Sequence, residues 1–319
     1  MSRYIATRIL SSLVILWIVS LVSFLLMNLL PGDPSFGIGG IESTPESLAA
    51  IRERLHLNDP LMERYFRWLF NALQGDLGLS LINQVSITDQ FARRLPATIE
   101  LGVLSLLVVV MVAIPVGVLA ALRPGSKREV TASTTMIVGN SVPEFLTGIA
   151  LILLLGLELD LLPVGGYVSI GEDPIENLKR MAMPVLAISL TATTLLMRQT
   201  RSAMINVLND DYIRTARAKG LRERTVIIRH GLRNAMIPVV TIFGFQVGLI
   251  FSGAVITENV FAIPGMGRWF VESVVINQDF AIIQNVVMFF AVAVVFVNLL
   301  VDLSYPLLDP RIRAGRETA

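Results

Sequence analysis

Long apolar runs alternate with polar segments along the chain. The first covers residues 9–30 and holds 22 residues without a charge. At about 1.5 Å per residue it crosses the roughly 30 Å of hydrocarbon in a bilayer. Five more runs follow, at about residues 97–122, 130–157, 181–197, 237–257 and 281–303. The pattern predicts an all-α integral membrane protein with six transmembrane helices.

The first run is predicted to stay in the protein. A cleaved signal peptide has an apolar region of only about 7–15 residues that ends in small residues, whereas this run ends in Leu29-Leu30-Pro31-Gly32. Residues 1–30 therefore form the N-terminal end and the first transmembrane helix.

A polar segment, residues 31–95, separates the first two runs. Residues 48–55 and 61–73 have amphipathic spacing, and Asn58-Asp59-Pro60 separates them, so the segment predicts two short helices. In the second helix Leu61, Tyr65 and Leu69 share one face. Such a hairpin caps the external mouth of a pathway or lies among lipid headgroups; a small ectodomain without a transport role is the alternative.

Composition supports a membrane protein, because 54% of the residues are hydrophobic and only 16% are charged. The net charge of +1 conceals an uneven distribution of basic residues between the two sides of the membrane. If the N-terminus is cytoplasmic, the inside segments hold 17 Arg or Lys residues and the outside segments hold nine, six of them in the long first loop. This distribution follows the positive-inside rule and places both termini in the cytoplasm.

Polar side chains within the apolar runs are candidates for lining a passage. A carboxylate at bilayer depth is costly and usually faces a bundle interior or a watery cavity. Glu144 has this position, in the sequence Asn140-Ser-Val-Pro-Glu144; equally, it could lie near an interface at the start of a broken helix. Asn140 and Gln246 are the other pathway candidates.

Two further features concern the second half of the chain. Gly and Pro punctuate residues 253–268, which predicts a re-entrant piece near the outer mouth. Asp302, near the inner end of the last run, is expected to contact the basic C-terminal tail or water rather than substrate.

A basic segment separates the fourth and fifth runs. From Arg198 to Arg233 it holds nine Arg or Lys residues against three acidic residues, so it should face the cytoplasm. Four residues recur there at helical offsets 0, 3, 4 and 7: Tyr212, Thr215, Ala216 and Lys219. With Asp211 at its start and Gly220 as a stop, the spacing predicts a short helix, whose small residues would let another protein approach closely.

These residues resemble a known family. Tyr212-Ile-Arg-Thr-Ala-Arg-Ala-Lys-Gly220-Leu221, followed by His230-Gly-Leu-Arg-Asn-Ala-Met-Ile-Pro238, is similar to the EAA loop of inner-membrane permease subunits of binding-protein-dependent ABC importers, in the dipeptide/oligopeptide branch. Arg214 stands where the family's Glu would be, and the loop ends further from Gly220 than is common. An ordinary cytoplasmic loop would explain the charge but not this order of residues.

The resemblance extends beyond the loop. It includes Pro31-Gly-Asp-Pro34, the stretches 57–61 and 75–80, Gly253-Ala-Val-Ile-Thr-Glu-Asn-Val-Phe261 and Pro264-Gly-Met-Gly-Arg268. It implies the transmembrane domain of a type I ABC importer, with core residues 96–306, a coupling loop at about 201–236 and a cytoplasmic tail, 307–319.

The resemblance also implies partners and a site. In the family a coupling helix docks in a groove of a separate ATPase. The implied partners are a homologous second permease subunit, two ATPase subunits that bind ATP and Mg, an external substrate-binding protein and membrane lipid; nucleic acid is not expected. The coupling residues are Asp211, Tyr212, Arg214, Thr215, Ala216, Arg217, Lys219 and Gly220. The implied cargo is peptide, although this branch also carries nickel chelates, glutathione and some sugars.

Catalytic chemistry is not visible in the chain. None of its three lysines follows a glycine, so it has no phosphate-binding loop of the Walker type. It has no cysteine, only two histidines, no His-Glu-x-x-His and no Gly-x-Ser-x-Gly. We therefore expect no enzyme activity, metal or cofactor in this chain. A secondary transporter or a channel is the rival class, and internal repeats with several membrane carboxylates would favour it.

Overall fold

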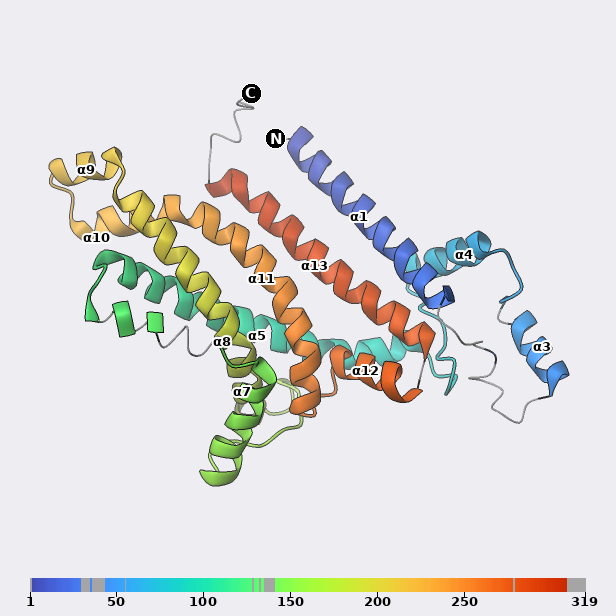
Figure 1. Cartoon of the computed structure of the whole chain (residues 1–319). Helices are drawn as coiled ribbons and strands as arrows, with labels where there is room; N and C mark the ends of the chain where they lie inside the picture. The colour runs from blue at the N-terminus through green and yellow to red at the C-terminus, as the bar shows by residue number, and fades with distance from the viewer. Residues whose placement is uncertain are drawn as a thin grey trace.

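The computed structural model describes residues 2–29, 35, 44–54, 56–127, 129–131, 133–134, 141–277 and 279–308. In this part of the chain the regular structure is helical, apart from one antiparallel bridge between Leu79 and Ser86. Figure 1 shows long helices with short helices at both ends of the bundle. The protein is an all-α membrane protein, as its sequence predicts.

Five helices of the described chain are long and apolar enough to cross a membrane. They are α1 (Ser2–Leu29), α5 (Ile87–Leu122), α8 (Pro174–Leu208), α11 (Arg233–Val260) and α13 (Phe280–Leu308). Two of them begin well before their apolar runs because polar caps start them. The Ser86 side chain accepts a hydrogen bond from Asp89 N at 3.3 Å, and Asp173 accepts from Ile175 N at 3.0 Å.

The apolar run 130–157 is broken in the part that is described, as the alternative interpretation of Glu144 at the start of a broken helix predicts. The chain turns at residues 141–143 and then forms α7 (Glu144–Leu151) and the π-helical segment η1 (Ile152–Glu158). Pro143 has ψ 140°. Pro143 is the N-cap of α7, a position where its missing N–H removes no helical hydrogen bond. Residues 132 and 135–140 lie outside the described residues.

The core lies where α8 packs between α5 and α11. Small residues allow these helices to approach closely: a Cβ placed on Gly117 of α5 would lie 2.8 Å from the carbonyl oxygen of Met197. Of the 18 most apolar consecutive residues in each helix, 67% are buried in α8, but only 17% in α1 and 11% in α13. These last two helices are therefore peripheral.

The peripheral helices α1 and α13 pair with each other. Tyr4 Oη donates to the carbonyl oxygen of Asp302 at 3.0 Å, and Arg8 Nη1 lies 3.4 Å from Asp302 Oδ2. The expectation that Asp302 contacts the C-terminal tail or water therefore missed its ion pair with Arg8. Residues 309–319 of that tail lie outside the described residues.

The segment after α1 contains the two predicted short helices, α3 (Pro45–Arg54) and α4 (Leu61–Leu73). Pro60 precedes α4 with ψ 140°, which separates the two. Helix α4 packs on α1, where Tyr65 Oη and Ser20 Oγ are 2.8 Å apart. Figure 1 shows α9 (Asp211–Ala218) at one end of the long helices, and α4 and α12 (Met266–Glu272) near the other.

Candidate functional site

Helix α9 occupies the predicted position in the basic segment. It spans Asp211–Ala218, and Lys219 follows it as the C-terminal cap. Gly220 has φ +72°, a left-handed conformation that glycine adopts without strain. Nothing lies within 4 Å of the position of a Cβ on Gly220, so its backbone angle, rather than space, requires glycine. The predicted helix and its stop are confirmed.

One face of α9 is an apolar anchor. Ile213 and Ala216 are buried, and with Val226 they form a small cluster against which Leu208 packs. Val226 begins the π-helical segment η2 (Val226–Leu232). Ala216 is only 7% exposed, so the expectation that it forms part of an open face of small residues is wrong. A helix of two turns has to bury an apolar stripe to stay in place, and Ala216 supplies it one turn after Ile213.

The remaining predicted coupling residues are exposed: Asp211, Tyr212, Arg214, Thr215, Arg217, Lys219 and Gly220. Arg217 forms a two-pronged ion pair with Glu223, with Nη2–Oε1 at 2.8 Å and Nε–Oε2 at 3.2 Å. The hydrogen bond with this carboxylate raises the pKa of the Arg217 guanidinium. The pair closes the turn after α9. Arg214 forms an exposed ion pair with Asp211 at 3.3 Å, and with Lys219 it contributes to a basic surface.

A polar brace joins α9 to the start of α11. Asn234 Nδ2 donates to Tyr212 Oη at 2.8 Å and to the carbonyl oxygen of His230 at 3.1 Å. Tyr212 Oη is 3.4 Å from the same carbonyl oxygen. The role of Asn234 was not predicted, although it lies within the stretch that carries the family resemblance.

The brace and the anchor attach α9 to a long rod. Helix α10 (Glu223–Thr225), η2 and α11 follow one another without a gap, and together they run from Glu223 to Val260. Helix α9 is therefore fixed to the N-terminal end of α11. The C-terminal end of the same rod carries a second cluster of polar contacts.

Glu258 is the centre of that second cluster and is fully buried. Thr98 Oγ1 of α5 donates to Glu258 Oε1 at 2.6 Å, and Arg268 N of α12 donates to Oε2 at 2.9 Å. Met266 N in turn donates to Thr98 Oγ1 at 2.8 Å. One carboxylate thus joins α5, α11 and α12, and we call these contacts the outer latch.

Glycines allow the latch to close. A Cβ on Gly267 would lie 2.5 Å from Val255 Cα, and one on Gly265 would overlap the Glu258 carboxylate. The loop before α8 contacts the same region, where Gly166 N donates to the carbonyl oxygen of Phe261 at 2.8 Å. Residues 253–260 of the predicted Gly/Pro segment are the end of helix α11 rather than irregular backbone, and residues 265–268 pack closely against them. A re-entrant position near the outer mouth stays a prediction.

A second link ties that loop to α5. Tyr167 Oη donates to Glu100 Oε2 at 2.8 Å. Burial is the larger cause and this hydrogen bond the second cause of a raised pKa of Tyr167, about 12. The phenol is therefore neutral and remains a donor at any physiological pH.

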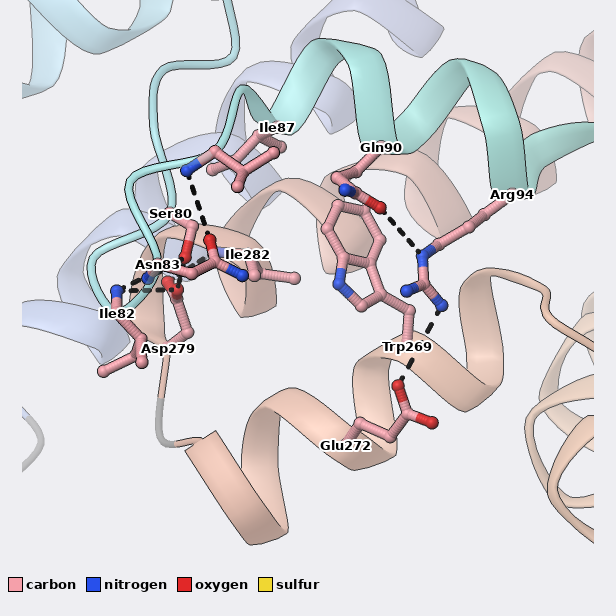
Figure 2. A pocket seen from close by; sticks show the side chains of 11 residues that line it. Ser80, Ile82, Asn83, Ile87, Gln90, Arg94, Trp269, Glu272, Asp279 and Ile282 are labelled. Atoms are coloured by element: carbon pink, nitrogen blue, oxygen red, sulfur yellow. Dashed lines mark hydrogen bonds and ion pairs between the residues drawn. The ribbon is translucent and has the colours of Figure 1, made fainter.

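A polar cavity of about 140 Å³ lies beside the latch (Figure 2). Asp279, fully buried at the start of α13, accepts from Ser80 Oγ at 2.5 Å and from Ile282 N at 3.2 Å. On the other side of the cavity, Arg94 Cζ of α5 lies 5.2 Å from the centre of the Trp269 ring. Arg94 Nη1 is 3.9 Å from Glu272 Oε2. These contacts connect the end of the first external segment to α12 and α13.

The pathway candidates lie in different surroundings. Glu144 is half-buried in the first turn of α7, and its carboxylate lies against the backbone of Gly253 in α11. Gln246 is fully buried, and its Nε2 donates to the carbonyl oxygen of Ala192 in α8 at 2.7 Å. In this conformation Gln246 joins two helices and presents no surface. Asn140 lies outside the described residues.

The described residues include no group of three or more His, Cys, Asp or Glu side chains that could hold a metal ion. The geometry instead offers an exposed basic helix seated on one end of α11 and a buried latch at its other end. The two parts lie at opposite ends of one helical rod, Glu223–Val260.

Comparisons with known proteins identify similar chains. Residues 113–314 match the family described as "Binding-protein-dependent transport system inner membrane component", and residues 1–102 match the N-terminal region of such membrane components. The chain is 38% identical to the dipeptide transport system permease protein DppB of Escherichia coli (strain K12), over 92% of this chain and 94% of that protein. It is 37% identical to the oligopeptide transport system permease protein AppB of Bacillus subtilis (strain 168), over 98% and 99%.

A solved structure shares the fold. The match is to a chain of the MetNI methionine ABC transporter in an inward-facing conformation, with a TM-score of 0.58 and 15% identity. It covers 69% of this chain and 96% of the other. At this identity the similarity concerns the arrangement of helices alone.

Proposed function

Because this chain belongs to the family of inner membrane components of binding-protein-dependent transport systems, we propose that it forms half of the pathway through which an ATP-driven importer moves peptides. It is a multi-pass inner membrane protein and a permease subunit of a peptide ABC transporter. The family consists of transport components, so the chain is not an enzyme. Its peptide cargo follows from the names of relatives that match almost its full length.

The proposed topology has six transmembrane segments and both termini in the cytoplasm. The five long helices supply five segments, and the broken α7–η1 stretch belongs to the remaining one. Residues 1–30 and the external segment 31–95 precede a core of residues 96–306, with the coupling loop at about 201–236 and a tail at 307–319. The distribution of basic residues supports this orientation.

The proposed assembly contains a second, homologous permease subunit, two ATPase subunits and an external binding protein. A binding-protein-dependent system implies the ATPases and the binding protein. ATP and Mg bind to the ATPases in this scheme. The second permease subunit would cover part of the apolar surface that the peripheral helices leave exposed, and lipid would cover the rest.

The proposed mechanism is alternating access driven through α9. Closure of the ATPases on ATP displaces α9 through its exposed residues, and the Ile213–Ala216 anchor and the Asn234 brace pass the displacement to α11. The outer latch then moves with the far end of α11 and opens or closes the external mouth. Glu144, which contacts α11 at Gly253, is the pathway candidate placed to sense that movement.

The observation that carries this mechanism is the two-sided construction of α9, with a buried anchor on one face and exposed residues on the other. Its test uses the assembled transporter in proteoliposomes, where ATP hydrolysis and peptide uptake are measured together. Thr215→Trp adds bulk and Lys219→Glu reverses charge at two exposed positions. Both are expected to reduce uptake per ATP hydrolysed at least tenfold while the protein still inserts.

The matched control for Lys219→Glu is Lys179→Glu, which reverses a charge on α8 near the opposite end of the bundle. It should leave the ratio of uptake to hydrolysis unchanged. Normal coupling in both α9 variants would refute the proposed role of α9. Purified chain that took up peptide from a gradient alone would refute the ABC mechanism.

A further inference from the structure

Helix α4 has more apolar surface than α1 covers. Tyr65 packs edge-to-face on Phe24 of α1, with ring centroids 5.5 Å apart. At about 100° per residue the apolar arc continues away from that contact. There it exposes Met62, Phe66, Phe70 and Leu73, which are 54%, 60%, 66% and 78% exposed. This outward stripe has no covering element among the described residues.

The contact with α1 determines the depth of α4. Ser20 and Phe24 lie near the outer end of the apolar span Tyr4–Leu26, in the orientation proposed above. Helix α4 therefore lies at the boundary between acyl chains and headgroups. An amphipathic helix at this boundary buries its apolar stripe among acyl chains and keeps its polar face at the level of the headgroups.

The polar face of α4 borders a cavity of about 270 Å³. The cavity lies between α4, the outer end of α1 and the start of α13, and Leu77, Gly78 and Leu81 also line it. A water molecule needs only about 10–15 Å³ of such space, so a larger group fits. Its charged or titratable side chains are two guanidinium groups, one carboxylate and one imidazole: Arg64, Arg67, Asp76 and His56.

Two donors that line this cavity have no acceptor among the described residues. Gln284 is 7% exposed, and its Nε2 is buried without a hydrogen-bond partner, as is Nε1 of Trp68. A buried donor without an acceptor is destabilising, because it has lost its hydrogen bonds to water. Burial also lowers the pKa of the Arg64 guanidinium, against the opposing effect of Asp59, so an anion would stabilise its charged form.

The acidic groups nearby already have partners. Asp59 Oδ2 lies 2.8 Å from Arg67 Nη1 and 3.2 Å from His56 Nδ1. Asp76 Oδ1 accepts from Gly78 N at 2.9 Å. Two unpaired donors and the Arg64 guanidinium remain on this lining, beside the amides of Asn28 and Asn71. A ligand with several acceptor oxygens and a negative charge satisfies these donors and the cation.

We propose that this cavity binds the phosphate diester of an outer-leaflet phospholipid, held by Arg64, Gln284 and Trp68. A phosphate diester carries one negative charge and oxygen acceptors for both unpaired donors. Lipid is its source because the site lies against α1, a peripheral helix, at headgroup depth. The bound lipid fills the space between α1, α4 and α13 and holds the external segment against the membrane.

The first experiment uses native mass spectrometry on the assembled transporter purified from membranes that contain phosphatidylglycerol. The wild type is expected to retain one phospholipid more per copy of this chain than the Arg64→Gln/Gln284→Leu variant. Arg93→Gln, an exposed arginine of α5, is the matched control and should retain the wild-type number. Should the double variant fail to assemble, Gln284→Leu alone is expected to weaken retention roughly tenfold. Equal retention by wild type and the assembled cavity variant would overturn the proposal.

A second measurement separates the possible sources of the anion. Dioleoylphosphatidylglycerol should raise the Tm of the delipidated transporter, whereas dioleoylglycerol, which lacks the phosphate, should not. A rise of the same size with inorganic phosphate would show an ion site instead. Displacement of the lipid by the dipeptide Ala-Ala would show a substrate site. Either result would overturn the lipid assignment.

The inference depends on the orientation proposed for the external segment but not on coupling through α9. ATP-dependent uptake is therefore measured in the same preparations. Retention of lipid in a transporter that fails to couple would leave this site standing and refute the coupling scheme alone. A transporter that couples normally but retains no lipid at this cavity would refute the lipid site and leave the coupling scheme unaffected.

Discussion

The two ends of the α10–η2–α11 rod are built in opposite ways. At the inner end, α9 rests on a small apolar cluster and an exposed polar brace through Asn234. At the outer end, Glu258 is fully buried and joins three helices. The inner end therefore resists displacement with a few weak contacts, and the outer end with one cooperative network.

The difference suits the two roles proposed for these ends. A surface that receives a partner has to remain solvated and adjustable, whereas a gate has to be closed or open without intermediate positions. A buried carboxylate that loses its donors is costly, so the latch has few stable arrangements. Its closure depends on α11 arriving at the correct position.

The largest effect is expected from Glu258→Ala. The change leaves Thr98 Oγ1 and Arg268 N without their acceptor, at about 1–3 kcal/mol for each buried donor. We expect a clearly lower Tm and loss of peptide uptake. Thermal unfolding and proteoliposome uptake measure these effects, with Glu172→Ala, an exposed outer carboxylate, as the control. An unchanged Tm would show that the latch contacts do not stabilise the folded protein.

The next effect is that of Gly267→Ala. The added methyl group would lie 2.5 Å from Val255 Cα, so α12 has to move away from α11. Overpacking of this kind costs about 1–3 kcal/mol, and we expect slower uptake with α9 unaffected. Gly171→Ala is the control, because its nearest contact is at 3.8 Å. Equal uptake rates for the two variants would contradict the close packing of the latch.

A more local effect is expected from Ala216→Leu at the inner end. The larger side chain does not fit between α9 and Val226, so α9 should separate from η2 while the Tm of the whole protein changes little. Hydrogen exchange of the α9 amides should accelerate. Ala218→Leu places the same bulk on the exposed side of α9 and should leave this exchange unchanged. Slow exchange in Ala216→Leu would disprove the anchor.

The smallest effect is expected from Tyr212→Phe, which removes the hydroxyl that accepts from Asn234. One exposed hydrogen bond is worth about 0.5–1.5 kcal/mol, so exchange of the α9 amides should accelerate by roughly threefold to tenfold. Tyr4→Phe, a hydroxyl on α1 that does not contact α9, is the control. If both variants exchange like the wild type, the brace has no role in seating α9.

Local signals predicted much of this architecture. Uninterrupted apolar runs indicate α1, α5, α8, α11 and α13, and Gly220 marks the end of α9. The break before α7 was one of the two alternatives for Glu144, and Pro143 is the N-cap there. Proline alone could not decide between them, because Pro115 and Pro184 lie inside the continuous helices α5 and α8.

Long-range contacts could not be predicted in the same way. The partner of Glu258 is Thr98, which lies 160 positions away in the chain. The local sequence around either residue does not indicate that the two are in contact. Helical spacing grouped Ala216 with Tyr212 and Thr215, but Ile213 decides which face is buried. That choice depends on Val226, which a pattern within α9 does not contain.

The clasp between Tyr4 and Asp302 joins positions 298 residues apart, and this separation affects how the protein is made. At about 5–20 residues per second, α13 leaves the ribosome roughly 15–60 s after α1. During that interval α1 can pack on α4, a described helix that is synthesised much earlier and contacts it at Ser20 and Phe24. Folding in the membrane is therefore complete only when α13 pairs with α1. In a nascent chain stopped before residue 280, α1 should lack this partner and be exposed to the quality-control machinery of the membrane.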